Sequence, residues 1–333
     1  MMIFSKGLSL ADLLNAVNNL HLFHDEEYNE LYLESGFYTP GYIVALTAFL
    51  HLHKVDMRGF DSHPDISGYL KAMDLSSALW GVTDYSLNRC NQGSNYSIIT
   101  PLHTSEIVDV ATESINGCIR SLTQTNESQG INDLFHVVGE LHDNVWSHGL
   151  SSGFSMAQKI RVPNSNGTDH YFEFALADHG MGFLAEMKRS KKGVTTHKEA
   201  IEWCIVEGNS TKHSDDIDDW AQTFPADLLG NNPIGDNEPM RHESNHHQGL
   251  GLAHLVKLVR KYNGKLYLIS GDVCFHIDTK GKEEFLNLQK DWKGVAISCR
   301  FKESELSVED NITPDEDILA IIKKLKGDTN EYN

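Results

Sequence analysis

The chain has 333 residues, enough for two domains or for one large domain with a sizeable hydrophobic core. Hydrophobic residues make up 40% and charged residues 23% of the chain, which excludes a disordered or fibrous protein. Its 28 lysines and arginines stand against 47 aspartates and glutamates, a net charge of −19 that disfavours binding of nucleic acid by the surface as a whole.

Cysteine usage and hydropathy predict a cytoplasmic protein. The five cysteines lie far apart and form no C-x-x-C pair, so they indicate neither a disulfide framework nor a thiolate zinc site. The most apolar stretch, residues 42–52, has only 11 residues and is too short to cross a bilayer. The N-terminal residues carry no recognisable export signal. We therefore expect neither secretion nor membrane insertion.

The N-terminal third alternates between strand and helix patterns, which is typical of an α/β domain. The predicted elements are a strand, a turn and a helix within 30–52, a short strand near 55–60, and helices over 66–79 and 105–122. Residues 121–130 are almost entirely polar and are the best candidate for a linker. We expect one domain to end, and another to begin, between about 100 and 130.

The rest of the chain predicts a second α/β unit and a short tail. Its expected elements are a helix over 131–148, strands at 156–162 and 170–176, a turn at 178–182, a helix over 249–262, and strands at 264–270, 272–277 and 293–301. In the acidic tail, 303–333, Thr313 and Pro314 predict the start of a final helix, and Gly327 predicts its end.

Three segments of this second unit suggest chemistry. In the first, Glu140, Asn144 and His148 recur four residues apart, so they share one stripe of the predicted helix. An amide oxygen can bind a Mg²⁺ that keeps several waters, while a carboxylate one turn away can orient and deprotonate a nucleophile. A solvated polar stripe is the alternative, because this spacing is common on amphipathic helices.

In the second segment, an apolar strand ends at Asp178, and Gly180 and Gly182 follow. The glycines allow the backbone to turn sharply and to approach a ligand closely. A carboxylate at this place can accept a hydrogen bond from an exocyclic amine such as that of adenine. An ordinary Asp-x-Gly turn would have the same sequence.

In the third segment, Gly249 and Gly251 directly precede an apolar helix. Small residues at the start of a helix leave backbone N–H groups open to oxyanions, and the helix dipole adds to the attraction for phosphate. A single G-x-G is common, so this segment indicates a phosphate site only in combination with the other two segments.

In this order and at these spacings, the three segments resemble the N-box and the two glycine boxes of the GHKL ATPase superfamily, over roughly residues 131–302. The resemblance implies a Bergerat-type α/β sandwich, a mixed sheet covered by helices, that binds Mg·ATP. It implies that Glu140 is the general base or the water-orienting carboxylate. Asn144 would then be the magnesium ligand, and Asp178 the acceptor for the adenine N6 amine.

The same resemblance extends to the neighbouring residues. Residues 144–149, NVWSHG, look most like the N-A-x-x-H-G of anti-sigma-factor serine kinases, which makes His148 a phosphate neighbour. Asp143 belongs to the same expected nucleotide site. The residues expected to shape the adenine side are Gly180 and Gly182, and those expected on the phosphate side are Gly249, Leu250, Gly251 and Leu252.

Two features qualify the resemblance. Family members often have a further glycine two residues before Gly249, where this chain has His247, so the loop would be stiffer or would hold the phosphates differently. The 66 residues between Gly182 and Gly249 would hold the ATP lid, 183–248, which begins with a predicted helix over 199–212.

The N-terminal region resembles, more weakly, the STAS-like domains found beside such ATPase modules. Residues 37–46 and 68–74 carry this resemblance, and any small α/β domain would fit them equally well. The expected organisation is a STAS-like domain over 1–120, a linker over 121–130, and a GHKL domain over 131–302.

The expected lid also contains a motif that is typical of a different function. His242, Glu243 and His246 match the H-E-x-x-H of zinc proteases, which requires a helix that brings both histidines to one face. Pro239 and Asn245 argue against that helix, so polar lid residues are the favoured interpretation.

The sequence therefore predicts a regulatory protein that binds Mg·ATP and either hydrolyses it or transfers its phosphoryl group to Ser or Thr of a protein partner. The first alternative is a module that binds ATP without turnover and presents a surface to a partner. The second alternative is a zinc hydrolase. A homodimer is compatible with the sequence, which leaves the partner and the reaction open.

Overall fold

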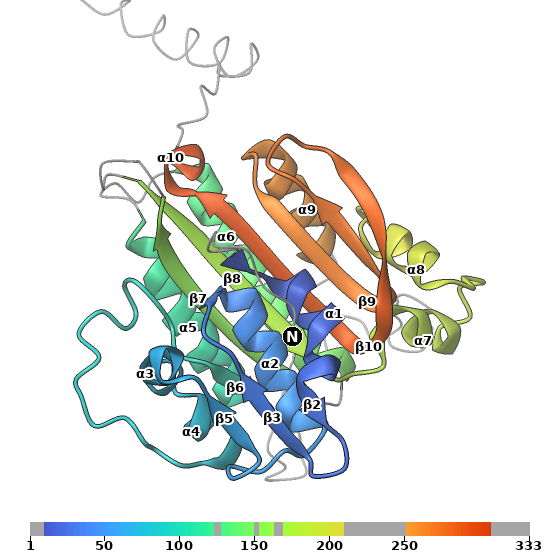
Figure 1. Cartoon of the computed structure of the whole chain (residues 1–333). Coiled ribbons are helices and arrows are strands. Elements are labelled where there is room, and N and C mark those ends of the chain that lie inside the picture. Colours follow the sequence, from blue (N-terminus) through green and yellow to red (C-terminus); the bar gives the residue numbers. More distant parts are fainter. Residues whose placement is uncertain (1–9, 123–127, 150–152, 163–168, 210–250, 308–333) are drawn as a thin grey trace, which may run out of the picture.

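The computed structural model describes residues 10–122, 128–149, 153–162, 169–209 and 251–307, and the chain is mixed α/β (Figure 1). Its centre is a five-stranded sheet. The strands in spatial order are β6 (Thr100–Leu102), β7 (Gly153–Arg161), β8 (His170–Asp178), β10 (Glu283–Lys302) and β9 (Lys265–Ile277).

The sequence predicted a mixed sheet, with parallel and antiparallel pairs, but the central sheet is antiparallel. Every pairing within the central sheet is antiparallel, because the strands are joined largely by hairpin-like returns: β7 to β8 and β9 to β10 follow each other directly. Among the described strands, parallel pairing occurs only in two small sheets of the N-terminal region. These sheets pair β1 (Leu10–Ala11) with β4 (Phe37–Tyr38), and β3 (Glu30–Leu33) with β5 (Phe60–Ser62) beside β2 (His24–Asp25).

Helices cover both faces of the central sheet (Figure 1). One face carries α5 (Ser105–Arg120), α6 (Gln129–Gly149) and α9 (Gly251–Lys261), and the other carries α1 (Leu13–Phe23) and α2 (Pro40–Leu52). The remaining helices are α3 (Pro64–Ala72), α4 (Leu75–Trp80), α7 (Gly182–Arg189), α8 (His197–Cys204) and α10 (Glu303–Leu306). Within the described ranges, no helix has the length and apolar run needed to cross a membrane.

Strand β8 shows why both faces are covered. Phe172, Phe174 and Leu176 enter the core beneath α5, α6 and α9. Ala175 and Ala177 alternate with them and enter the core beneath α1 and α2. Because successive side chains of a strand point to opposite faces, an almost continuous apolar run needs a cover on each side.

The structure differs from the expected division at 121–130. Strand β6 and helix α5 precede this segment, yet they belong to the central sheet and to the helical layer that includes α6. Helices α1 and α2 complete their core only against β7, β8, β9 and β10. The described N-terminal region is thus a layer of the same fold. Apolar periodicity along the chain cannot reveal which surface covers a helix.

Two predicted elements differ locally from the observed ones. The helix expected over 66–79 is two helices, α3 and α4, separated where Asp74 takes a left-handed conformation with φ of 67°. The strands expected to end and begin around Gly271 form one strand, β9. Gly271 has φ of +64°, and a Cβ there would lie 2.2 Å from the His197 ring, so the glycine lets α8 pack against the strand. The helix expected near Thr313 lies outside the described residues.

A buried carboxylate joins the N-terminal layer to the sheet. Glu173 of β8 accepts hydrogen bonds from Gly41 N at the start of α2 (3.0 Å) and from Ser298 Oγ (2.9 Å). Arg300 of β10 donates to the same carboxylate through Nε at 2.8 Å. The charge is therefore paired, and it also meets the positive end of the α2 dipole.

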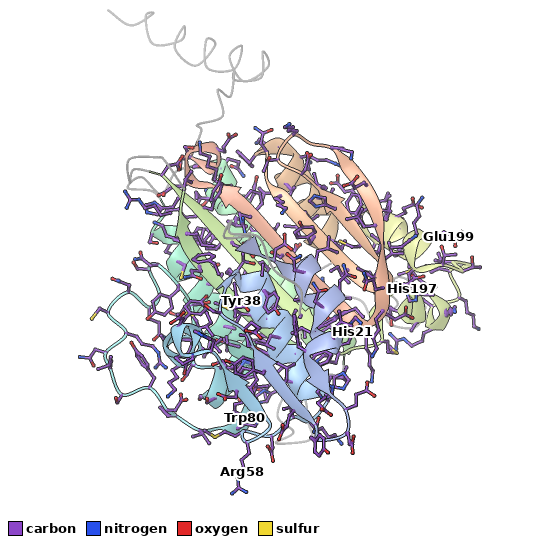
Figure 2. All side chains as sticks on the ribbon, viewed as in Figure 1. His21, Tyr38, Arg58, Trp80, His197 and Glu199 are labelled. Atoms are coloured by element: carbon purple, nitrogen blue, oxygen red, sulfur yellow. The ribbon has the colours of Figure 1, made fainter. Side chains whose placement is uncertain are left out.

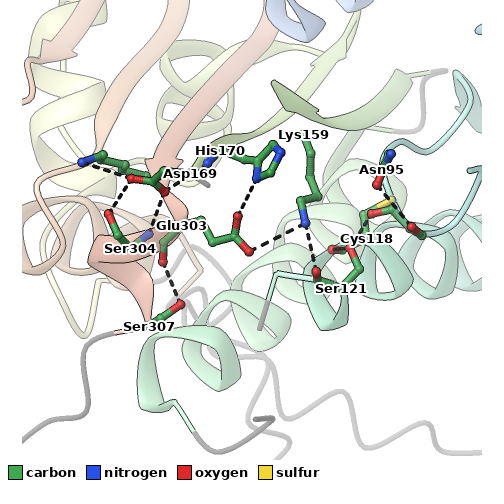
Figure 3. Close-up of polar contacts among 11 residues, drawn as sticks. Asn95, Cys118, Ser121, Lys159, Asp169, His170, Glu303, Ser304 and Ser307 are labelled. Atoms are coloured by element: carbon green, nitrogen blue, oxygen red, sulfur yellow. Dashed lines mark hydrogen bonds and ion pairs between the residues drawn. The ribbon is translucent and has the colours of Figure 1, made fainter. Parts of the chain in front are cut away.

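A second polar cluster closes the far end of the sheet (Figure 3). Glu303 of α10 receives a hydrogen bond from His170 Nδ1 at 2.9 Å and lies 3.7 Å from Lys159 Nζ. Ser304 Oγ donates to Asp169 at 2.9 Å. These contacts hold α10 across the ends of β7 and β8, so residues after the last strand still belong to the fold.

Replacing Glu173 tests the buried connection. We expect Glu173→Ala to lower the free energy of unfolding by about 3–5 kcal/mol, because it leaves the half-buried Arg300 without its carboxylate. The matched control is Glu283→Ala, which breaks an exposed pair with Arg260 and should cost no more than about 1 kcal/mol. Urea unfolding measures both. Equal losses in the two variants would contradict the role of Glu173.

Candidate functional site

The three sequence segments meet at one cavity. It has a volume of about 130 Å³ and lies among α6, the end of β8, α7, α8, the start of α9 and β10. Predicted site residues from all three segments line it: Asn144, Asp178, Gly180, Gly182 and Leu252. Residues more than 100 positions apart in the sequence thus share one concave surface.

Asp178 is the buried acid of this cavity. Strand β8 ends at Asp178, which is 6% exposed. Its Oδ1 accepts hydrogen bonds from Gly180 N at 2.6 Å and from Val295 N at 3.3 Å. No described residue donates to Oδ2, so one carboxylate oxygen is left as an acceptor for a ligand in the cavity.

Burial changes the acidity of Asp178. Loss of solvent raises the pKa of this carboxyl to about 6, although the two backbone N–H groups partly oppose the rise. The side chain is therefore mostly an ionised acceptor at neutral pH and gains a proton as the pH falls through about 6. A perturbed acid in a cavity is a frequent property of functional sites.

Glycines leave the space that this carboxylate occupies. A Cβ on Gly294, which has φ of +93°, would lie 2.3 Å from the backbone oxygen of Asp178 and 2.6 Å from its Oδ1. Ser270 Oγ donates to the carbonyl of Gly294 at 3.1 Å and accepts from Phe183 N at 3.2 Å. A Cβ on Gly182 would lie 2.9 Å from that hydroxyl. The turn after Asp178 is thereby fixed against β9 and β10.

His179 connects this turn to the N-terminal layer. Its Nε2 donates to the carbonyl of Ala48 on α2. Its ring is stacked on His51, with centroids 6.1 Å apart, and lies 6.0 Å from the Trp292 ring. Burial lowers the pKa of His179 to about 4, so the imidazole is neutral at pH 7. Helix α2 therefore contacts the turn that follows Asp178 through Ala48 and His51.

The polar stripe of α6 faces the start of α9. Glu140 and Asn144 both approach Gly251: a Cβ on this glycine would lie 3.1 Å from Glu140 Oε2 and 3.6 Å from Asn144 Nδ2. Glu140 Oε2 is buried and has no hydrogen-bond partner in the described part of the chain, and His254 Nδ1 lies 3.7 Å from it. The predicted carboxylate, amide and glycine therefore come together.

Of the other predicted residues, some lie in the described structure away from the cavity, and the rest lie outside the described residues. Asp143 lies on α6 but does not line the described part of the cavity. His148 belongs to α6, and its side chain is outside the description. The remaining predicted positions also lie outside the described residues: Gly249, Leu250, His242, Glu243, His246 and most of the expected lid. Among described residues, no cluster of three potential ligands could hold a metal ion.

One wall of the cavity comes from the first part of the segment predicted as the ATP lid, 183–248, in which the helix predicted over 199–212 is the shorter α8. Phe183, Met187, Trp203 and Cys204 of α7 and α8 line it opposite the strands. Helix α8 begins with a capping box between Thr196 and Glu199, and Figure 2 shows Glu199 and His197 at this helix beside β9. The S/T-x-x-E pattern could have predicted the start of the helix, but nothing local indicates that α8 covers the cavity.

The acidity of Asp178 predicts how stability depends on pH. Because its native pKa is about 6 and above its ordinary value, the native state binds the proton more tightly, and stability falls as pH rises from about 4 to 7. Asp178→Asn keeps an acceptor at Oδ1 and removes this dependence. We expect the variant to gain up to about 3 kcal/mol relative to wild type across that interval. Urea titrations at several pH values measure it, and a constant difference would contradict the buried charge.

A pair of glycine variants tests how the carboxylate is held. Gly294 and Gly281 both have positive φ, 93° and 76°, but a Cβ on Gly281 would meet nothing within 4 Å. Gly281→Ala should cost only backbone strain, about 1–2 kcal/mol. Gly294→Ala should cost about 1–3 kcal/mol more, because the new methyl group displaces Asp178. Thermal or urea unfolding provides the comparison, and equal costs would mean that no such displacement occurs.

Comparison with protein-family models, with curated proteins and with solved structures finds no match for this chain.

Proposed function

We propose that this chain binds Mg·ATP in the cavity beside Asp178 and hydrolyses it, or transfers its phosphoryl group to Ser or Thr of a protein partner. The proposal includes a GHKL-type identity for 131–302. One observation carries it: the three segments that resemble the N-box and glycine boxes, far apart in sequence, line or adjoin one cavity. Coincidental motifs have no reason to converge in this way.

The Asp178 side of the cavity fits a purine base. A free Oδ2 is available to accept a hydrogen bond from an exocyclic amine, and the apolar side chains of Leu176, Val295 and Ile297 offer contacts for a flat ring. Guanine presents a carbonyl oxygen where adenine presents its N6 amine. A carboxylate acceptor therefore supports a preference for adenine.

The α6 and α9 side fits a phosphate chain with its metal. Asn144 lines the cavity and would supply a neutral oxygen to Mg²⁺, which when bound neutralises charge on the phosphates. The start of α9 at Gly251 lies directly against this stripe. In a chain with a net charge of −19, a polyanion must be held by such local groups.

Glu140 is the candidate general base. Its carboxylate lies one turn from Asn144 on α6, and one of its oxygens is buried and has no hydrogen-bond partner among the described residues. It would accept the proton of the attacking water or hydroxyl as the oxygen of that group bonds to the γ-phosphorus, while the bond to the bridging oxygen breaks and ADP leaves. If no acceptor is attacked, the same site would act as the ATP-sensing module of the first alternative.

Binding and turnover can be separated by two variants. Wild type should bind Mg·ATP in isothermal titration, and Asp178→Asn should weaken binding about 10–100-fold, because the acceptor for the exocyclic amine is lost. Glu140→Gln should retain affinity and lower turnover about 100-fold or more, to a residual rate that can still be measured as phosphate release or as transfer to partner proteins. Asp61→Asn, at the exposed position of strand β5, is the control and should change neither.

The outcomes distinguish the alternatives. Failure of wild type to bind Mg·ATP would overturn the proposal. Binding with no turnover in wild type would favour the sensing module. Equal affinity of wild type and Asp178→Asn would remove the assignment of the base to Asp178.

A further inference from the structure

Glu140 has an unusual environment for a carboxylate. Its side chain is 18% exposed, yet its Oε2 atom is fully buried and receives no hydrogen bond from any described residue. Buried oxygens of a carboxylate normally have donors, because leaving one without a partner costs free energy. An unpartnered oxygen inside a candidate catalytic site indicates a contact that is long in this structure and shortens at another stage of the reaction.

Among the described residues, His254 is the polar group that faces this oxygen. Its Nδ1 lies 3.7 Å from Glu140 Oε2, longer than a hydrogen bond, and its side chain is 35% exposed and has room to move. The neighbouring positions of α9, Leu252, Ala253 and Leu255, are buried in the core. The helix therefore directs its single polar side chain in this turn toward Glu140.

Gly251 makes this approach possible. It lies one turn before His254 and contacts Glu140 closely enough that a Cβ would come within 3.0 Å of the Glu140 Cβ. A side chain at this position would separate α9 from α6. The glycine thus has a packing role in bringing His254 to Glu140, in addition to any role at phosphates.

We propose that His254 is a positioning residue for Glu140, an inference that rests on the proposed phosphoryl chemistry. In the reactive state, the N–H at Nδ1 donates to Oε2 of Glu140, and the other oxygen, Oε1, faces the attacking group. Oε1 takes the proton of that group as its oxygen bonds to the γ-phosphorus. The bond from this phosphorus to the bridging oxygen breaks, ADP leaves with that electron pair, and His254 keeps its own proton. Catalytic hydrogen bonds are often long in the ligand-free state and tighten when substrate binds.

Three substitutions of His254 test the geometry. His254→Ala should lower kcat roughly 10-fold or more while leaving the Kd for Mg·ATP unchanged. His254→Asn places an amide nitrogen near the position of Nδ1 and should restore much of kcat. His254→Gln places its nitrogen near Nε2 and should not. Arg260→Ala, at the other end of α9, is the control.

A double-mutant cycle tests whether His254 acts through Glu140. If it does, His254→Ala should cause no further loss of kcat in the Glu140→Gln background. Additive losses would overturn the proposal. A raised Kd for Mg·ATP in His254→Ala, with kcat unchanged, would also overturn it, because His254 would then contact the nucleotide.

The tautomer of His254 gives a readout that is independent of ATP. Nitrogen-15 NMR of the folded chain should show the proton of neutral His254 on Nδ1, and Glu140→Ala should shift the population toward Nε2. A tautomer that does not respond to Glu140 overturns the pairing, whatever the activity. If wild type does not bind Mg·ATP but the tautomer responds, the proposed function fails and the Glu140–His254 contact stands.

Discussion

The central sheet is buried on both faces, and the rest of the structure depends on this burial. Strand β8 sends Phe172, Phe174 and Leu176 to one core and Ala175 and Ala177 to the other. Neither set can be removed from water unless helices cover both sides. The N-terminal helices are thus required by the same strand that delivers Asp178 to the cavity.

The same burial gives the candidate site its electrostatic character. At the end of β8, Asp178 is already surrounded by packed chain, so its carboxyl is desolvated and its pKa rises. Gly294 and Gly182 allow neighbouring backbone to approach it, and His179 fixes the following turn on α2. An acceptor held in this way needs little reorganisation when a ligand arrives, which is the physical basis of preorganised binding.

Much of the C-terminal unit could be predicted from local patterns, since its elements are long and strongly periodic. Helix α6, strand β8 and helix α9 occur close to the expected limits, and the residues singled out on them line or adjoin the cavity. Two predictions differ from the structure: the domain boundary at 121–130 and the mixed sheet of the C-terminal unit. A polar segment was interpreted as a boundary between domains, although it connects two helices of one layer.

The sequence by itself determined which residues are candidates for chemistry, because the spacing of Glu140 and Asn144 and the placing of Asp178 before glycines follow from local geometry. Only the tertiary structure decided that α2 covers the sheet, that Gly294 leaves space for Asp178, and that His254 faces Glu140. These are contacts between distant segments, and their partners are chosen by packing of the whole chain, which no local pattern encodes.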